Sequence, residues 1–248
     1  MDSSIVLLFL GLLAACGNLL GGLLAAAPRW DGHKHLKSII AIGAGFMLSA
    51  VMLRMIPESL QLAGSNGAWL LLSGYLLVHF CEHSLVPHFH YGEETHADEV
   101  AHGSIQAYAV LFGLVVHAVF DGVCISSGFK VRPALGILLF LAVMLHKLPE
   151  GATIASLMLV TGHRRRSAVL AAGFIGVATL VGVSSIAFWF KHLTVPGLAL
   201  SSGVTLYVAA TDLMPMVNEE KGVKMAFLVY LGVLCFVGTE LILEGCGL

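Results

Sequence analysis

The sequence predicts an all-α polytopic membrane protein with eight transmembrane helices. Of its 248 residues, 58% are hydrophobic and only 11% are charged, and the mean hydropathy of +0.91 is far above that of a soluble domain. Its apolar runs are each about 20 residues or longer, which is the length that crosses a bilayer as a helix. The runs are continuous rather than alternating, which favours helices over the strands of a β-barrel.

The apolar runs are separated by short polar or proline-containing stretches. The first run ends in "LLAAAPRW", which is typical of a signal-peptide cleavage region, but its leader "MDSS" carries no positive charge and the run is too long. We therefore expect a retained first helix and a single transmembrane domain over residues 1–248. The eight spans are expected at residues 4–27, 37–63, 67–87, 104–128, 133–160, 167–190, 196–217 and 223–245.

The basic residues between the spans are divided unequally between the two sides of the membrane. One side carries Arg29, Lys34, Lys37, Arg164, Arg165, Arg166, Lys221 and Lys224. The other side carries only Lys130, Arg132 and Lys191. Because basic loops stay in the cytoplasm, both termini are predicted to be non-cytoplasmic. We favour a plasma or inner membrane over an organellar one, since no sorting signal is evident.

Charge and cysteine pattern exclude two further classes. A net charge of -2, without a basic patch, argues against a nucleic-acid partner. No Cys-x-x-Cys pair occurs, so neither a disulfide framework nor a thiolate zinc site is indicated. The five cysteines are scattered along the chain at Cys16, Cys81, Cys124, Cys235 and Cys246.

The longest polar stretch, "HFHYGEETHADEVAHG" at residues 88–103, is predicted to be a cytoplasmic loop after the third span. Its composition suits either loose binding of a divalent metal or a solvated linker, and the sequence leaves both open. The histidines concerned are His83, which lies near the end of the predicted third span, and four in the loop itself: His88, His90, His96 and His102.

Two segments predict an inverted repeat of spans one to three and six to eight around a central pair, spans four and five. "GFMLSAVMLRMIP" at residues 45–57 and "GVTLYVAATDLMP" at residues 203–215 share Gly, Leu and Pro at equivalent places. The two segments cross the membrane in opposite directions, as the halves of many transporters do. Arg54 and Asp212 occupy the same point of the repeat, and we expect them to form an ion pair because each would be costly unpaired in lipid.

Two apolar runs contain the same polar frame: a histidine, three residues, a carboxylate and a glycine. "HAVFDG" begins at His117 and "HKLPEG" begins at His146. Residues i and i+4 lie on the same face of a helix, so Asp121 faces the same way as the first histidine and Glu150 the same way as the second. Two nitrogens and at least two oxygens around one point suit zinc, with iron(II), manganese and cobalt as alternatives.

A structural alternative gives the histidines ordinary hydrogen bonds and pairs the carboxylates with Lys147 or Arg54. Within lipid, however, each ionisable group costs a few kcal/mol or more and is seldom present without a ligand or a pathway. Four such groups in two matching frames therefore favour a metal site. Gly122 and Gly151, which directly follow the carboxylates, are expected to let neighbouring helices come close.

The motifs "GLVVHAVFDG" and "MLHKLPEG", with "LYVAATDLMP" on the seventh span, resemble the ZIP family of divalent-metal transporters, the Zrt- and Irt-like proteins. The resemblance implies that the metal ligands are His117, Asp121, His146 and Glu150, and that the protein is a transporter without catalytic residues. It also implies transport toward the cytosol, by movement of spans one, four, five and six against spans two, three, seven and eight. The expected substrate is zinc, with iron(II), manganese, cobalt or cadmium as alternatives. Members of the family are commonly homodimers.

Two positions depart from the family pattern. Many members carry Asn where this chain has Ala118, and an acid or amide where it has Lys147, and these groups build a second, bridged metal site. An ammonium at Lys147 would repel a second cation and neutralise the bridging carboxylates. We therefore predict one transported metal ion for each chain.

Two rival functions rest on single features. "HFCEH" spells the H-x-x-E-H pattern of an intramembrane zinc metalloprotease, with His79 and His83 as zinc ligands and Glu82 as general base. A buried Lys147 would also suit a Schiff base in a retinal protein. The protease pattern lacks an identifiable third ligand, and the Schiff base leaves the repeated histidine frame unexplained.

Overall fold

The computed structural model describes residues 3–27, 33–85, 104–220 and 223–247. These residues are helical almost throughout and include no strand, so the predicted all-α fold is confirmed for the described part of the chain. Within that part, seven helical segments are long and apolar enough to cross a membrane. They are α1 (Ser3–Ala25); α2 (His33–Ala50) with η1 (Val51–Met55) and α3 (Ile56–Ala63); α5 (Ser104–Val131); α6 (Pro133–Val160); α7 (Arg165–Ser184) with η3 (Ser185–Trp189); η4 (Lys191–Leu193) with α8 (Thr194–Tyr207), η5 (Val208–Leu213) and α9 (Met214–Asn218); and α10 (Val223–Gly245).

The remaining predicted span, the third, corresponds to α4 (Ser65–Leu85). Its 21 residues extend about 31 Å at 1.5 Å for each residue, which is long enough to cross the hydrocarbon layer. It is less apolar than the seven because it begins with Ser65 and Asn66 and carries His79 and Glu82. α4 therefore has the length of a membrane span but not the apolar composition of the others.

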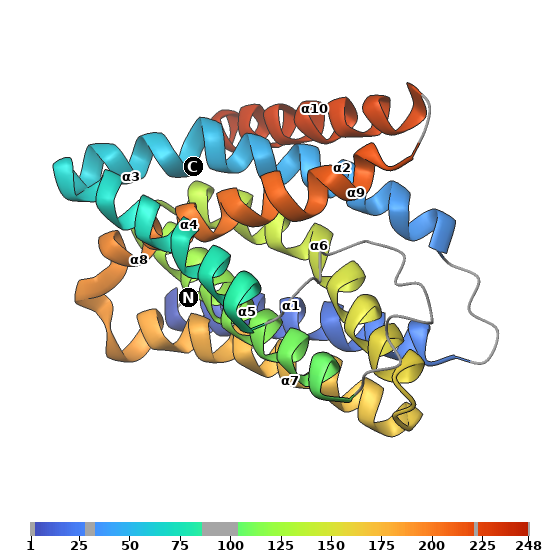
Figure 1. The fold of residues 1–248 in the computed structure, drawn as a ribbon. Coiled ribbons are helices and arrows are strands. Elements are labelled where there is room, and N and C mark those ends of the chain that lie inside the picture. Colours follow the sequence, from blue (N-terminus) through green and yellow to red (C-terminus); the bar gives the residue numbers. More distant parts are fainter. Residues whose placement is uncertain (1–2, 28–32, 86–103, 221–222, 248) are drawn as a thin grey trace.

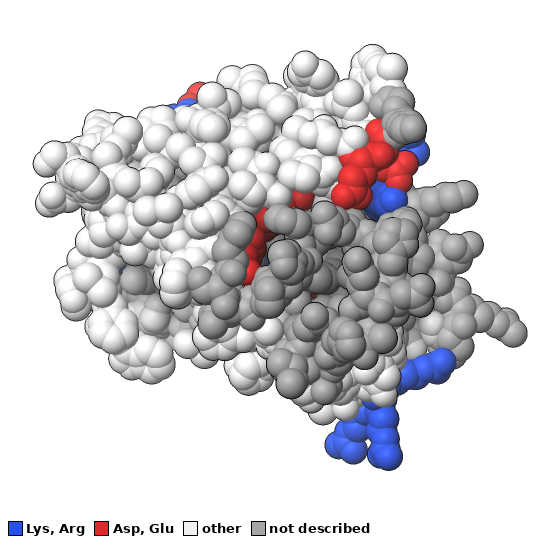
Figure 2. Space-filling model, in the orientation of Figure 1, with Lys and Arg blue, Asp and Glu red and all other residues white. Residues whose placement is uncertain are grey.

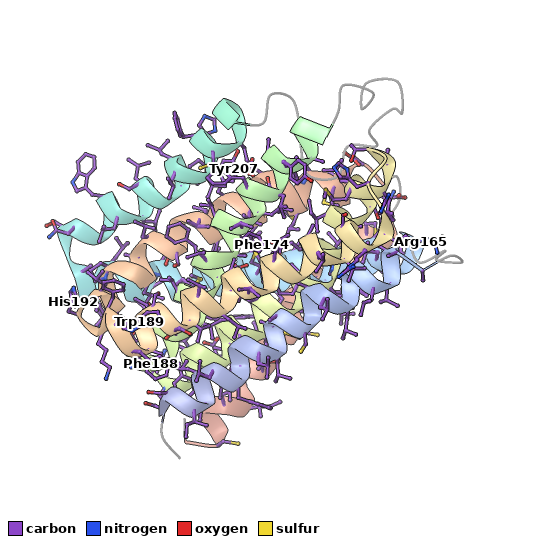
Figure 3. All side chains as sticks on the ribbon, turned by 90° about the horizontal axis from the view of Figure 1, so that it is seen from below. Arg165, Phe174, Phe188, Trp189, His192 and Tyr207 are labelled. Atoms are coloured by element: carbon purple, nitrogen blue, oxygen red, sulfur yellow. The ribbon has the colours of Figure 1, made fainter. Side chains whose placement is uncertain are left out.

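The helices lie side by side, and many of the charged side chains on one face gather toward one end of the bundle. α1 begins and α10 ends in the half of the bundle that lies away from the beginnings of α2 and α7 (Figure 1). Figure 3 shows Arg165 at one end of α7 and Trp189 and His192 at the opposite end. Most charged side chains of the face in Figure 2 gather near the beginnings of α2 and α7. There Lys37 Nζ lies 2.5 Å from Glu220 Oε1, and this hydrogen bond lowers the pKa of the Glu220 carboxyl.

The helices pack as two sets. α1, α5, α6 and α7 lie against one another, while α2, α3, α4, α8 and α10 form the second set. The sets meet where α8 lies on α5 and where α2 and α10 lie on α6. Buried small and branched side chains from α5, α6 and α7 fill the core of the first set. The contacts follow the division of spans that the family resemblance implies.

The two segments of the predicted repeat share an unusual backbone feature. η1 and η5 are both π-helical, and each is followed closely by a proline, Pro57 and Pro215. A π-helical turn within an α-helix is rare and is frequent at functional sites. Its occurrence at the same place in both segments is a similarity that the sequence alignment did not contain.

The predicted ion pair between Arg54 and Asp212 is wrong. Arg54 pairs instead with Glu240 and Glu244 of α10, with Nη2 lying 3.0 Å from Glu244 Oε1. Asp212 accepts a hydrogen bond of 3.1 Å from Thr211 Oγ1. Equal depth in two segments does not bring their side chains together, because α2 packs against α10 whereas α8 packs against α4.

The packing of α10 on α2 depends on a glycine. A Cβ at Gly232 would lie 2.1 Å from the carbonyl oxygen of Ile42, whereas a Cβ at Gly238 in the same helix would have nothing within 4 Å. Close approach of helix backbones through small residues is the usual packing device in membranes.

Gly232→Ala should lower the free energy of unfolding by roughly 1–3 kcal/mol, because the added methyl group overlaps the backbone of α2. Gly238→Ala should be neutral or stabilise the protein by up to about 1 kcal/mol through helix propensity. Thermal unfolding of the purified variants in detergent measures both effects. Equal stability of the two variants would contradict this packing.

Candidate metal centre

Three of the four predicted ligands converge at the crossing of α5 and α6. His117 and Asp121 come from α5 and His146 comes from α6. Ligand atoms of these three side chains all lie within 4.8 Å of one another, and all three residues are buried. The i and i+4 spacing places the first two on one face of α5, as the sequence predicted.

The distances between the ligand atoms fit a small metal ion. His117 Nε2 and His146 Nε2 each lie 3.2 Å from Asp121 Oδ2. Two ligands bound to one tetrahedral zinc ion at about 2.0–2.2 Å are separated by roughly 3.3–3.5 Å. The two nitrogens are therefore spaced from the carboxylate oxygen much as ligands of a single ion are.

The orientation of the imidazoles also favours a cation. His146 Nδ1 lies 3.1 Å from the carbonyl oxygen of Ala142. That oxygen only accepts, so Nδ1 carries the hydrogen, and Nε2 of a neutral ring turns its lone pair toward the Asp121 carboxylate. The lone pair of His146 Nε2 and the carboxylate oxygen of Asp121 are both acceptors, so at 3.2 Å they need a cation or a proton between them. Metal-binding histidines are commonly fixed through their other nitrogen in this way, and both ring nitrogens of His117 lack a hydrogen bond to any described residue.

The fourth predicted ligand, Glu150, is held by Lys147 instead. Lys147 Nζ lies 2.6 Å from Glu150 Oε2 and 2.6 Å from Asp121 Oδ2, so one ammonium joins the two carboxylates. Lys147 is fully buried, and Glu150 Oε1 has no hydrogen bond to any described residue. Two carboxylates against one ammonium leave the centre negative when the imidazoles are neutral, which favours a further cation.

The two departures from the family pattern fit this arrangement. Ala118 is fully buried in the apolar cluster of α5, α6 and α7 and offers no polar ligand. Lys147 places an ammonium between the carboxylates that a second ion would share. In the part of the chain that the structure describes, His117, Asp121 and His146 are the one group of side chains that could hold a metal ion.

A cavity of about 60 Å³ borders the centre, between the two sets of helices. This volume accommodates a few water molecules. Its lining includes His117, His146 and Glu150 from the first set, and Glu82 of α4 and Asp212 of η5 from the second. Three of the four candidate ligands therefore border a small, largely apolar space whose lining includes two further carboxylates.

Cys81 and Glu82 of the "HFCEH" motif line this cavity, and among the described side chains His79 and Glu82 belong to no group that could hold a metal ion. Tyr207 Oη donates a hydrogen bond of 2.9 Å to Glu82 Oε2, and its ring lies edge-on to His79 with 6.1 Å between centroids. Tyr207 lies at the end of α8 (Figure 3). No role was predicted for this residue from the sequence, although it lies within "LYVAATDLMP". The side chain of His83 is not described, and four loop histidines lie outside the described residues: His88, His90, His96 and His102.

Lys147→Met should lower the free energy of unfolding by about 3–5 kcal/mol, because it removes the ammonium that neutralises the buried charges of Asp121 and Glu150. Adding Glu150→Gln removes one of these charges and should recover part of the loss. Thermal unfolding of the wild type, the single variant and the double variant in detergent tests this. A Lys147→Met protein as stable as the wild type would show that the ammonium does not hold the centre together.

Comparisons with known proteins agree with this geometry. A family model described as "ZIP Zinc transporter" matches residues 81–243, well over half of the chain. Zinc transporter ZIP9 of Xenopus tropicalis is 24% identical to this chain in an alignment 265 residues long. The alignment covers 87% of this chain and 86% of the relative. Zinc transporter ZIP13 of Pongo abelii is 24% identical over 217 residues, covering 77% of this chain and 61% of the relative. Zinc transporter foi of Drosophila melanogaster is 29% identical over 143 residues, covering 56% of this chain and 20% of the relative.

These matches confirm the resemblance inferred from the sequence motifs, and they decide against both the protease and the retinal protein. Together with the buried His117, Asp121 and His146, they identify a multi-pass membrane transporter and not an enzyme. The chain belongs to the ZIP family of zinc transporters.

Proposed function

We propose that this protein transports divalent metal cations, zinc first, toward the cytosol through a site for one ion formed by His117, Asp121, His146 and Glu150. The observation that carries the proposal is the pair of imidazole Nε2 atoms, each 3.2 Å from the same carboxylate oxygen. His117 Nε2, His146 Nε2 and Asp121 Oδ2 would supply three ligand atoms of a tetrahedral site. Glu150, one turn after His146 in α6, would supply the fourth.

Binding requires the ion to exchange its hydration shell for these ligands. Glu150 reaches the ion by turning its carboxylate away from Lys147, while Lys147 keeps its contact with Asp121. An ion that binds too tightly cannot leave, so a transport site has to be of moderate affinity and accessible to water. The cavity beside His117 and His146 supports such a partly hydrated site.

The ligand types favour zinc but admit other metals. Imidazole and carboxylate together bind zinc, iron(II), manganese and cobalt, and at a given site of this kind zinc binds more tightly than manganese or iron(II). Cadmium shares the preference for nitrogen ligands. We therefore expect zinc to be the preferred substrate, with the other ions as competitors.

The distribution of charge supports an orientation of the bundle in the membrane, and transport toward its cytoplasmic end is what the family resemblance implies. We assign the end of the bundle that carries Arg164, Arg165 and Arg166 to the cytoplasm, with both termini on the other side of a plasma or inner membrane. In this orientation α4 also crosses the bilayer, as the third span along the chain, in addition to the seven more apolar spans. Glu82, in the last turn of α4, and Asp212 line the cavity on the way from the centre to the loop that is predicted to be cytoplasmic.

We further infer that spans one to three and six to eight form an inverted repeat around α5 and α6. The π-helical turns η1 and η5, each followed by a proline, support this inference. The packing of the helices as two sets supports movement of α1, α5, α6 and α7 against the rest. The chain would form one transmembrane domain and act as a homodimer, as family members commonly do.

The predicted loop histidines complete the proposal. They would receive the released ion or sense its concentration, because clustered imidazoles bind divalent metals loosely. The residues concerned are His83, His88, His90, His96 and His102.

Zinc entry into proteoliposomes, reported by a trapped fluorescent chelator, tests the transport function and its ligands together. The wild type should take up zinc, while His146→Ala and Glu150→Gln should reduce the initial rate at least about tenfold through loss of a ligand. Glu219→Gln makes the same chemical change at an exposed carboxylate after α9 and should transport normally. Normal uptake by His146→Ala would contradict the site, and failure of the folded wild type with zinc, iron(II) and manganese would contradict the transport function.

The number of ions bound tests the role of Lys147 and Ala118. Equilibrium dialysis followed by metal analysis should find one zinc ion for each chain, measured with residues 88–103 deleted so that loop histidines do not contribute. The double variant Lys147→Gln and Ala118→Asn restores the ligand types that many family members have, and it should bind two. Two ions in the chain that retains Lys147 and Ala118 would overturn the single-ion site.

A further inference from the structure

Asn18 is a polar residue on the buried face of α1, and the centre described above does not use it. Its side chain is fully buried. Neither the amide nitrogen nor the amide oxygen has a hydrogen bond to any described residue. Unpaired buried groups of this kind destabilise a fold, and an apolar residue of the same size would avoid the cost. The asparagine is therefore a candidate for a role in function.

Asn18 lies directly against the part of α6 that carries Lys147 and Glu150. A Cβ at Gly151 would lie 2.0 Å from the backbone oxygen of Asn18, and a Cβ at Gly17 would lie 3.2 Å from Lys147 Cβ. Because Gly151 directly follows Glu150, Asn18 stands at the level of that carboxylate. The two glycines bring the backbones of α1 and α6 close enough for short side chains to meet.

The charged groups beside Asn18 leave hydrogen-bonding capacity that an amide would complete. Glu150 Oε1 has no hydrogen bond to any described residue and needs a donor. The Lys147 ammonium has three N–H groups, and its contacts of 2.6 Å with Asp121 and Glu150 account for two of them. An asparagine side chain offers both a donor and an acceptor, so it matches both groups.

The packing around Ala118 shows that small side chains line the interior of this four-helix set. Ala118 is fully buried and belongs to the same cluster as Ile154 of α6 and Ala172 of α7. Ala172 is also the residue that a Cβ at Gly22 of α1 would meet, at 2.4 Å. α1 therefore packs against the cluster that contains Ala118.

We propose that Asn18 is a positioning residue that holds Glu150 and Lys147 while Glu150 binds the transported cation. When Glu150 turns its Oε2 to the cation, Lys147 loses one acceptor. Asn18 Oδ1 then accepts a hydrogen bond from the ammonium, and Asn18 Nδ2 donates one to Glu150 Oε1. Both charges stay hydrogen-bonded during the exchange, so the step does not create an unpaired buried charge. This inference rests on the proposed function, because it requires Glu150 to bind the ion.

The kinetics of zinc uptake by Asn18→Leu, together with its thermal stability, test the proposal. Leucine has the same branching at Cγ as asparagine, although its methyl groups are larger, and it has no hydrogen-bonding group. The KM for zinc should rise on the order of tenfold, as it does when groups that orient metal ligands are removed. Thermal stability should stay equal or increase, because a buried unpaired amide is lost. A residue that matters for packing alone would not reduce transport while the fold becomes more stable.

Two further variants sharpen the experiment. Ser126 has a buried hydroxyl that also lacks a hydrogen bond to any described residue, and Ser126→Ala should leave the KM unchanged. The double variant Asn18→Ala and Ala118→Asn returns an amide to the same interior from α5, and it should recover part of the lost affinity.

The assay includes Glu150→Gln so that the two proposals are tested separately. Loss of uptake in Glu150→Gln with a wild-type KM in Asn18→Leu overturns the role of Asn18 alone. Destabilisation of Asn18→Leu that accounts for its lost transport does the same. Absence of zinc uptake by the folded wild type overturns the proposed function, and the role of Asn18 with it.

Discussion

The buried ammonium of Lys147 is the interaction on which the centre depends. Asp121 and Glu150 are two buried carboxylates that would repel each other and would be costly without a counter-charge. Lys147 Nζ lies 2.6 Å from an oxygen of each, so it does permanently what a second metal ion would do reversibly. Because this cation is covalently part of α6, it cannot be exchanged, which is consistent with the proposed site for a single ion. The lysine stem also shapes the packing, since α1 has Gly17 where the stem passes.

The glycine that ends each polar frame has the same structural role in both. A Cβ at Gly122 would lie 2.1 Å from the carbonyl oxygen of Thr179 in α7, and a Cβ at Gly151 would lie 2.0 Å from that of Asn18 in α1. Each carboxylate is thus followed by the residue at which a neighbouring backbone crosses its helix. This close packing covers each helix directly beside its carboxylate, and Glu150 also borders the cavity. The repeated frame therefore specifies the ligands and the walls of the centre together.

The parts of the centre that could be predicted from the sequence are those that depend on one helix at a time. The i and i+4 spacing placed His117 beside Asp121, and the cost of intramembrane charges pointed to a shared site with His146. From the sequence, a metal site and ion pairs with Lys147 were alternatives, whereas the structure combines a cluster that could hold a metal ion with a lysine bridge. The partner of Arg54 could not be predicted, because it depends on which helices pack together: Arg54 meets α10 at Glu240, 186 residues away in the sequence. The unpaired amide of Asn18 depends on how α1 packs against α6, and a single asparagine in an apolar run was its one signal.

The ligands and the cavity belong to different parts of the fold, and this separation bears on how an ion would leave. The three converging ligands all lie on α5 and α6, within one set of helices, whereas Glu82 and Asp212 face them from the other set. A shift of one set against the other would change access to the centre without changing the 3.2 Å distances within it. If the ligands were divided between the sets, opening would instead require metal bonds to break as the helices moved. The observed arrangement would let the ion exchange its ligands for water in a cavity that already contains two carboxylates, so that release depends on access rather than on dismantling the site.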